Sequence, residues 1–139
     1  MELIFFIAVG LYLSVYDYKH RIIPDIVVLP SILFLLLLRY INDTLSIEYF
    51  YATLFIVSVF ILPIIFNMRF GGGDIRFGIF AAILLGFPNI ALFLLFSAIL
   101  HLLLLLILKK KEYPFAPSMY IAAILVYMMS ELLWKIIQT

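Results

Sequence analysis

Long apolar stretches, each interrupted by a short segment of polar residues, glycine or proline, follow one another along the whole chain. The apolar residues run continuously instead of alternating with polar ones, a pattern that favours helices buried in an apolar environment over half-exposed strands. The pattern predicts six helices, with approximate bounds 2–16, 25–41, 48–66, 74–87, 89–108 and 117–136. The fourth is short, and we expect it to begin inside the bundle with a glycine-rich, non-helical segment that lines a cavity.

The composition indicates that these helices lie in a membrane. Of the 139 residues, 68% are hydrophobic and only 12% are charged, against about 25% charged residues in a typical soluble domain. A bilayer core about 30 Å thick requires about 20 apolar residues per helix. We therefore expect an all-α membrane protein, a polytopic bundle of about six transmembrane helices that forms a single domain over residues 1–139. The lipid bilayer is an expected partner and nucleic acid is not, since the net charge is only +1.

Several kinds of site are excluded by the residues that the chain lacks. It contains no cysteine, which rules out disulfides, thiolate zinc sites and cysteine nucleophiles. Its two histidines, His20 in a predicted loop and His101 in a predicted span, have no second metal ligand at helical spacing. We therefore expect no metal and no cofactor. The first apolar stretch begins with Glu2 and not with a basic region, so we interpret it as a retained helix and not as a signal peptide.

Basic residues are concentrated in alternate loops, and their distribution predicts the orientation because cytoplasmic loops carry the excess of Lys and Arg. The loops after the first, third and fifth predicted helices contain most of them, namely Lys19, Arg21, Arg69, Arg76 and Lys109–Lys111. The other side has only Arg39 and Lys135. We therefore expect these three loops in the cytoplasm and both termini outside, in the plasma (inner) membrane.

Two aspartates, Asp17 and Asp74, stand at the ends of apolar stretches, where a charged side chain costs on the order of 2–3 kcal/mol. The predicted orientation places both at the cytoplasmic face. Two carboxylates that meet there would form a dyad able to hydrolyse a peptide bond with water and no metal. Such a pair cannot easily ionise twice, so it shares a proton and one apparent pKa is raised. The sequence leaves open which aspartate holds the proton.

The neighbours of the aspartates allow more than one interpretation. Gly71–Gly73 would let Asp74 project into a pocket beside a substrate backbone, because glycine permits close backbone approach, or would merely turn the chain. Asp17, considered alone, could form an interfacial ion pair with Lys19 or Arg21.

The residues beyond the two aspartates also have competing interpretations. Pro24 and Asp25 are typical of a helix start. Arg76 could tune the dyad or extend toward a lipid phosphate.

Taken together, these motifs resemble those of a known family. Asp17 followed by Ile23-Pro24-Asp25, and the segment Gly71–Asp74 followed by Arg76, resemble the type IV prepilin peptidase family and its archaeal preflagellin relatives, which are membrane aspartyl proteases with a GxGD motif. Residues 113–119 resemble the proline-containing stretch before the last helix of the family. The resemblance covers nearly the whole chain.

The resemblance implies specific roles. Asp17 and Asp74 would be the catalytic aspartates, Gly71 and Gly73 the motif glycines, and Pro24 and Arg76 would support the active site. The implied substrates are pilin-like or archaellin-like precursors with a short basic leader, cut at the cytoplasmic membrane face before an apolar helix and commonly after glycine. Many bacterial members also methylate the new N-terminus with a cytoplasmic domain that has paired CxxC motifs. Because this chain has no cysteine, we expect a minimal peptidase without methyltransferase activity.

Two other classes of function remain open from the residues alone. In a small proton-coupled transporter or channel, Asp17 and Asp74 would relay protons, although both lie at one face and not along a path across the bilayer. In a non-catalytic subunit of a pilus or secretion assembly, both carboxylates would tolerate replacement.

Overall fold

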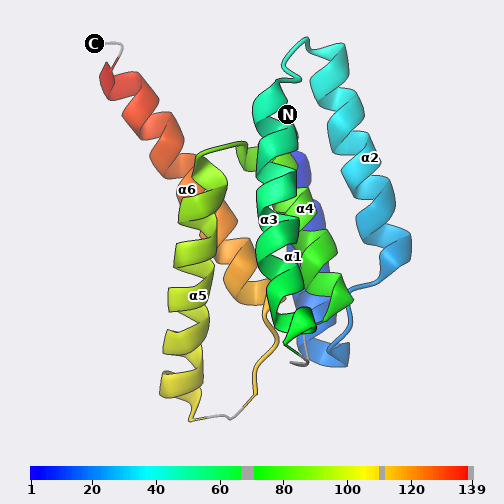
Figure 1. The fold of residues 1–139 in the computed structure, drawn as a ribbon, viewed down its shortest axis with the longest axis vertical. Helices are drawn as coiled ribbons and strands as arrows, with labels where there is room; N and C mark the ends of the chain where they lie inside the picture. The colour runs from blue at the N-terminus through cyan, green and yellow to red at the C-terminus, as the bar shows by residue number, and fades with distance from the viewer. Residues whose placement is uncertain (67–70, 110–111, 138–139) are drawn as a thin grey trace.

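The structure, a computed structural model, describes residues 1–66, 71–109 and 112–137. Within these ranges it consists of six α-helices and has no strand: α1 Glu2–His20, α2 Asp25–Ile41, α3 Ile47–Ile65, α4 Gly72–Leu85, α5 Asn89–Leu108 and α6 Ala116–Ile137. Successive helices run in opposite directions, so the N-terminus and the last turn of α6 lie at the upper end of Figure 1. The predicted all-helical bundle is confirmed.

Helix α4 occupies the centre of the bundle and packs against all five other helices. Every side chain from Phe80 to Leu85 is buried. With 14 residues, α4 is about 21 Å long, which is shorter than a bilayer core of about 30 Å. Because protein and not lipid surrounds it, this helix can be apolar on all sides without spanning the full thickness.

Aromatic rings hold α1 against α4. Phe6 stacks on Phe80 with ring centroids 4.7 Å apart and meets Phe77 edge-on at 6.1 Å. All three side chains are fully buried. Aromatic pairs of this kind contribute about 0.5–1.5 kcal/mol beyond the area that they bury. The cluster therefore fixes the two helices that carry the candidate aspartates relative to each other.

A glycine allows α3 to approach α4 closely. A Cβ atom at Gly78 would lie 2.8 Å from Cγ1 of Ile56 and 2.9 Å from Cε2 of Phe60. Small residues at helix interfaces permit this kind of close packing in membrane bundles. Gly78 of α4 therefore lies at the point where α3 packs closely against α4.

Three helices are long and apolar enough to cross a membrane, over residues 47–65, 89–108 and 116–136. Large hydrophobic side chains are also exposed on the outer faces of the bundle, among them Leu33, Leu106 and Ile107, and extended exposed apolar surfaces are typical of contact with lipid. The expectation of a helical membrane protein is supported. That all six helices cross the membrane remains a prediction, because among the described residues only these three helices are both long enough and apolar enough to do so.

Two of the predicted helix boundaries are wrong. Helix α1 continues four residues past its predicted end to His20 and stops at Arg21, whose φ of 55° is left-handed. His20 is therefore helical and not in a loop. Gly72 and Gly73 form the first turn of α4 instead of a non-helical segment. The first N–H groups of a helix have no intrahelical partner, so glycine is better tolerated there than in the interior. Arg69, Lys110 and Lys111, used to predict the orientation, lie outside the described residues.

Candidate active site

The structure brings Asp17 and Asp74 to the same place, although 57 positions separate them in the chain. Both line a cavity of about 570 Å³ between the α1–α2 linker and the start of α4. Both also line a second cavity of about 250 Å³ on the side of the segment that precedes α6. The structure therefore brings the two predicted residues to the same end of the bundle, and their role as a catalytic dyad stays a prediction.

The start of α6 holds Asp17 in place. The side chain is only 6% exposed, and its Oδ2 accepts a hydrogen bond of 3.2 Å from the backbone N–H of Ala116, the first residue of α6. The first N–H groups of a helix lack intrahelical partners and carry a partial positive charge, so a carboxylate is favourable there. Arg21 lines the same cavity as Asp17, but its direct ion pair is with Glu112 at 2.9 Å.

Asp74 lies in the first turn of α4, where the two motif glycines leave room around it. Its N–H donates to the carbonyl of Gly71 at 3.0 Å. A Cβ atom at Gly71 would lie 3.1 Å from Oδ2 of Asp74, and one at Gly73 would lie 2.8 Å from Cβ of Ile23 in the linker. Gly71 therefore leaves space for the carboxylate itself. Gly73 lets α4 approach the linker that follows the helix of Asp17.

Pro24 and Arg76 line the larger cavity on its α2 side. Pro24 directly precedes Asp25, the first residue of α2, as the interpretation of a helix start predicts. Arg76 forms an ion pair with Asp25 in which Nη1 donates to Oδ1. Neither sequence-based interpretation of Arg76 included this partner. The pair links α4 to α2 at the edge of the cavity.

At the opposite end of the bundle, sequence reasoning missed a buried arginine. Arg39 is only 5% exposed, and it donates to the carbonyls of Ile83 at 2.6 Å and Leu84 at 2.8 Å, in the last turn of α4. In the sequence pattern, Arg39 contributes only to the predicted orientation, as a basic residue on the outer side. The available signal is that Arg39 is the single basic residue of α2 and directly follows an apolar stretch.

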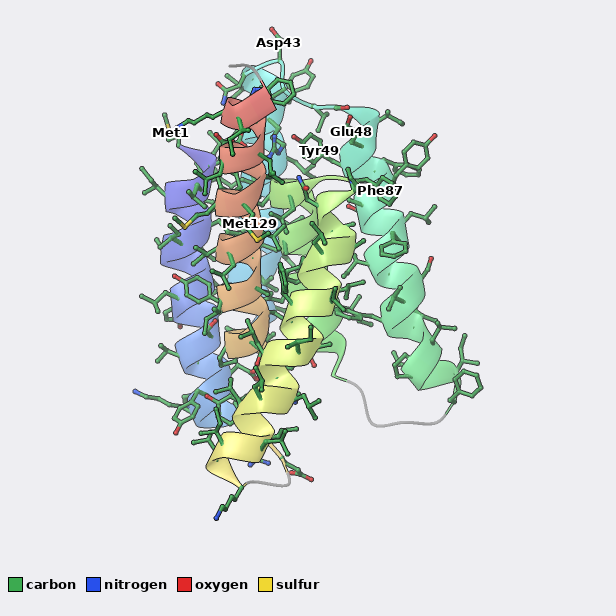
Figure 2. All side chains as sticks on the ribbon, turned by 90° about the vertical axis from the view of Figure 1, so that its left-hand side faces the viewer. Met1, Asp43, Glu48, Tyr49, Phe87 and Met129 are labelled. Atoms are coloured by element: carbon green, nitrogen blue, oxygen red, sulfur yellow. The ribbon has the colours of Figure 1, made fainter. Side chains whose placement is uncertain are left out.

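Two further side chains complete the environment of Arg39. Oε2 of Glu2 lies 3.0 Å from its Nη2. The hydroxyl of Tyr49 accepts a hydrogen bond of 2.6 Å from Nη1, and the guanidinium carbon lies 3.9 Å from the centre of the Tyr49 ring. Figure 2 shows Tyr49 at the same end of the bundle as Met1. Arg39 therefore joins α1, α2 and α3 to the end of α4 that is far from Asp74.

The chemistry available at the cavity is that of carboxyl groups. Within the part of the chain that the structure describes, no three His, Cys, Asp or Glu side chains come together in a way that could hold a metal ion. Of two neighbouring carboxyl groups, the ionised one can accept a proton from water while the protonated one polarises a carbonyl.

Comparison with protein-family models matches residues 4–106 to the type IV leader peptidase family. The matched region contains Asp17, Asp74 and the glycines Gly71–Gly73. Neither the curated proteins nor the solved structures gave a match. Since the family model covers well over half of the chain, the protein belongs to the type IV leader peptidase family.

Proposed function

We propose that this protein is a membrane aspartyl endopeptidase that removes the basic leader from pilin-like or archaellin-like precursors at the cytoplasmic membrane face. Membership of the type IV leader peptidase family supports a peptidase acting on prepilin-type substrates. The observation that carries the finer proposal is the convergence of Asp17 and Asp74 on the same two cavities. In this proposal residues 1–139 act as a single peptidase domain without methyltransferase activity.

The proposed reaction uses one proton shared between the two carboxyl groups. The ionised carboxylate takes a proton from water as the water oxygen attacks the scissile carbonyl carbon, and the protonated carboxyl donates a hydrogen bond to the carbonyl oxygen. Collapse of the tetrahedral intermediate then breaks the C–N bond, and a proton passes to the leaving amine. The hydrogen bond from Ala116 keeps Asp17 oriented during these steps.

Cleavage of a defined precursor tests this proposal. Purified protein in phospholipid vesicles would be mixed with a synthetic precursor that has a lysine-containing leader, a glycine at the junction and an apolar helix. We expect one cut at the junction, identified by the masses of the two products. An intact precursor after prolonged incubation with folded protein would contradict the peptidase proposal and favour a non-catalytic subunit.

The predicted orientation can be tested by cysteine labelling, because the chain has no cysteine of its own. Asp43 lies in the α2–α3 loop, at the same end of the bundle as Met1 (Figure 2). Lys19 lies in the last turn of α1, at the other end. In intact cells we expect an impermeant thiol reagent to label the Asp43→Cys variant and to leave the Lys19→Cys variant unlabelled. The reverse pattern would place the aspartates on the outer face, where the basic leader is not retained.

Close packing at Gly73 predicts a large effect of a single methyl group. In the Gly73→Ala variant, the new Cβ would lie 2.8 Å from Cβ of Ile23, so the start of α4 must move away from the linker and carry Asp74 with it. Because small displacements of catalytic groups are costly, we expect kcat/KM for precursor cleavage to fall on the order of 10- to 100-fold.

Gly72 provides the matched control for this substitution. Beyond its chain neighbours and the backbone of its own helix, a Cβ atom at Gly72 would have no atom within 4 Å, and alanine favours a helix more than glycine does. The Gly72→Ala variant should therefore cleave at close to the original rate. Equal kcat/KM values for the two variants would show that packing against Ile23 does not position Asp74.

A further inference from the structure

An apolar groove of about 350 Å³ runs along the side of the bundle between α1 and α6. Leu11, Val15 and Tyr18 line it from α1, and Tyr120 and Ile121 line it from α6. Four of these five side chains are exposed, with Tyr120 as the half-buried exception. The groove is therefore an accessible apolar surface and not part of the core.

The groove leads to the two aspartates. Tyr113 lines both the groove and the smaller of the two cavities that contain Asp17 and Asp74. At this junction the rings of Tyr18 and Tyr113 lie 5.9 Å apart, centre to centre. Since Tyr18 directly follows Asp17 in the chain, the groove ends beside the candidate catalytic residues.

Charge changes abruptly where the groove meets the cavity. The groove side chains named above are all apolar or aromatic, whereas the cavity contains three acidic side chains and one basic side chain, Asp17, Asp74, Glu112 and Arg21. Even with one proton shared between Asp17 and Asp74, acidic charge is in excess. A ligand that fits both parts has an apolar segment joined to a polar segment without negative charge.

The length of the groove suits the beginning of a helix. Leu11 and Tyr18 are seven residues apart on α1, which corresponds to about 10 Å or two helical turns. A substrate helix that starts just after the scissile bond would therefore cover the groove with its first two turns.

We propose that the α1–α6 groove binds the first two turns of the apolar helix of the precursor, and that the basic leader lies in the smaller cavity beside Asp17, Asp74 and Glu112. This inference rests on the proposed peptidase function and adds the direction in which the substrate lies. A phospholipid also joins an apolar chain to a polar group. Its phosphate, however, would meet the excess of acidic side chains, which favours the precursor as the occupant.

Photo-crosslinking tests the occupant directly. A photoreactive benzoylphenylalanine would replace Leu11 or Ile121 in the Asp74→Asn variant, which binds without cleaving. The same replacement at Leu33, an exposed residue of α2, provides the control. The probe is the synthetic lysine-leader precursor in phosphatidylethanolamine and phosphatidylglycerol vesicles. We expect crosslinks from positions 11 and 121 to the first two turns of the apolar helix, and at least about fivefold fewer from position 33.

A kinetic measurement supplies an independent criterion. A tryptophan at Leu11 would fill part of the groove, so the Leu11→Trp variant should raise KM for the precursor about tenfold, while the Leu33→Trp variant keeps the original KM. Crosslinks only to lipid, or only to a second copy of this chain, would overturn the proposal, as would equal KM values for the two variants. Failure of the wild-type protein to cleave the precursor would instead contradict the peptidase function. The crosslinking experiment can still succeed in that case, because it depends on binding and does not depend on cleavage.

Discussion

Replacement of either Asp17 or Asp74 by asparagine should abolish precursor cleavage and leave the protein folded. Asparagine keeps the shape of the side chain but can neither hold nor transfer the shared proton. At position 17 its amide oxygen can still accept the hydrogen bond from Ala116 that the carboxylate accepts now. Since general acid–base catalysis contributes about 100- to 10,000-fold, we expect kcat to fall by at least about 100-fold in each variant. The double variant should lose little more, because the two groups act as a unit.

Asp25 offers a matched Asp-to-Asn control in the same cavity. Asp25 begins α2 and pairs with Arg76, and its side chain is about half exposed, so its interaction is worth about 0–1 kcal/mol. The Asp25→Asn variant should retain much of the activity. Cleavage would be followed by mass spectrometry at equal amounts of folded protein. Appreciable cleavage by the Asp17 or Asp74 variant would contradict the dyad, and an inactive Asp25 variant would question the choice of Asp17.

Replacement of Arg39 by methionine should strongly destabilise the bundle. The substitution leaves Glu2 without its cationic partner, although this carboxylate is only 17% exposed. It also removes both side-chain donors to the carbonyls at the end of α4. Breaking a buried ion pair by removing one partner costs about 3–5 kcal/mol. We therefore expect the free energy of unfolding, measured by titration of mixed micelles with SDS, to decrease by about that amount.

Arg21 provides the comparison for Arg39. Its ion pair with Glu112 has a similar length of 2.9 Å, but the two side chains are 63% and 78% exposed, and exposed pairs contribute about 0–1 kcal/mol. The Arg21→Met variant should therefore unfold at nearly the original SDS fraction. If the Arg39 and Arg21 variants lost the same stability, burial would not be the factor that makes the Arg39 interactions important.

Besides stabilising the bundle, Arg39 fixes the position of α4. Arg39 holds the last turn of α4, while the contact between Gly73 and Ile23 positions its first turn. Both ends of the helix that carries Asp74 are thus tied to neighbouring helices. We expect that the Arg39→Met variant, where it remains folded, also cleaves more slowly.

The helical membrane character and the number of helices could be predicted from the sequence, because both depend on properties that lie along the chain. Apolar stretches separated by glycine, proline and charge predict helices without any knowledge of their packing. Asp17 lies near the end of the first helix and Asp74 at the start of the fourth. In a bundle whose successive helices run in opposite directions, the end of the first helix and the start of the fourth lie at the same end of the bundle. The motif Gly71–Asp74 then indicated the type IV leader peptidase family, and the family match confirms this.

The contacts between distant residues could not be predicted from the sequence, since contacts across the bundle leave no periodic signal along the chain. The hydrogen bond from Ala116 to Asp17 joins residues 99 positions apart, and the contact of Arg39 with Ile83 spans 44. Helix ends were uncertain for a related reason. Whether α1 continues to His20, and whether Gly72 and Gly73 join α4, depends on neighbours that cap and pack those turns. Local pattern therefore predicted the elements, and packing between distant elements determined the environment of each aspartate and of the buried arginine.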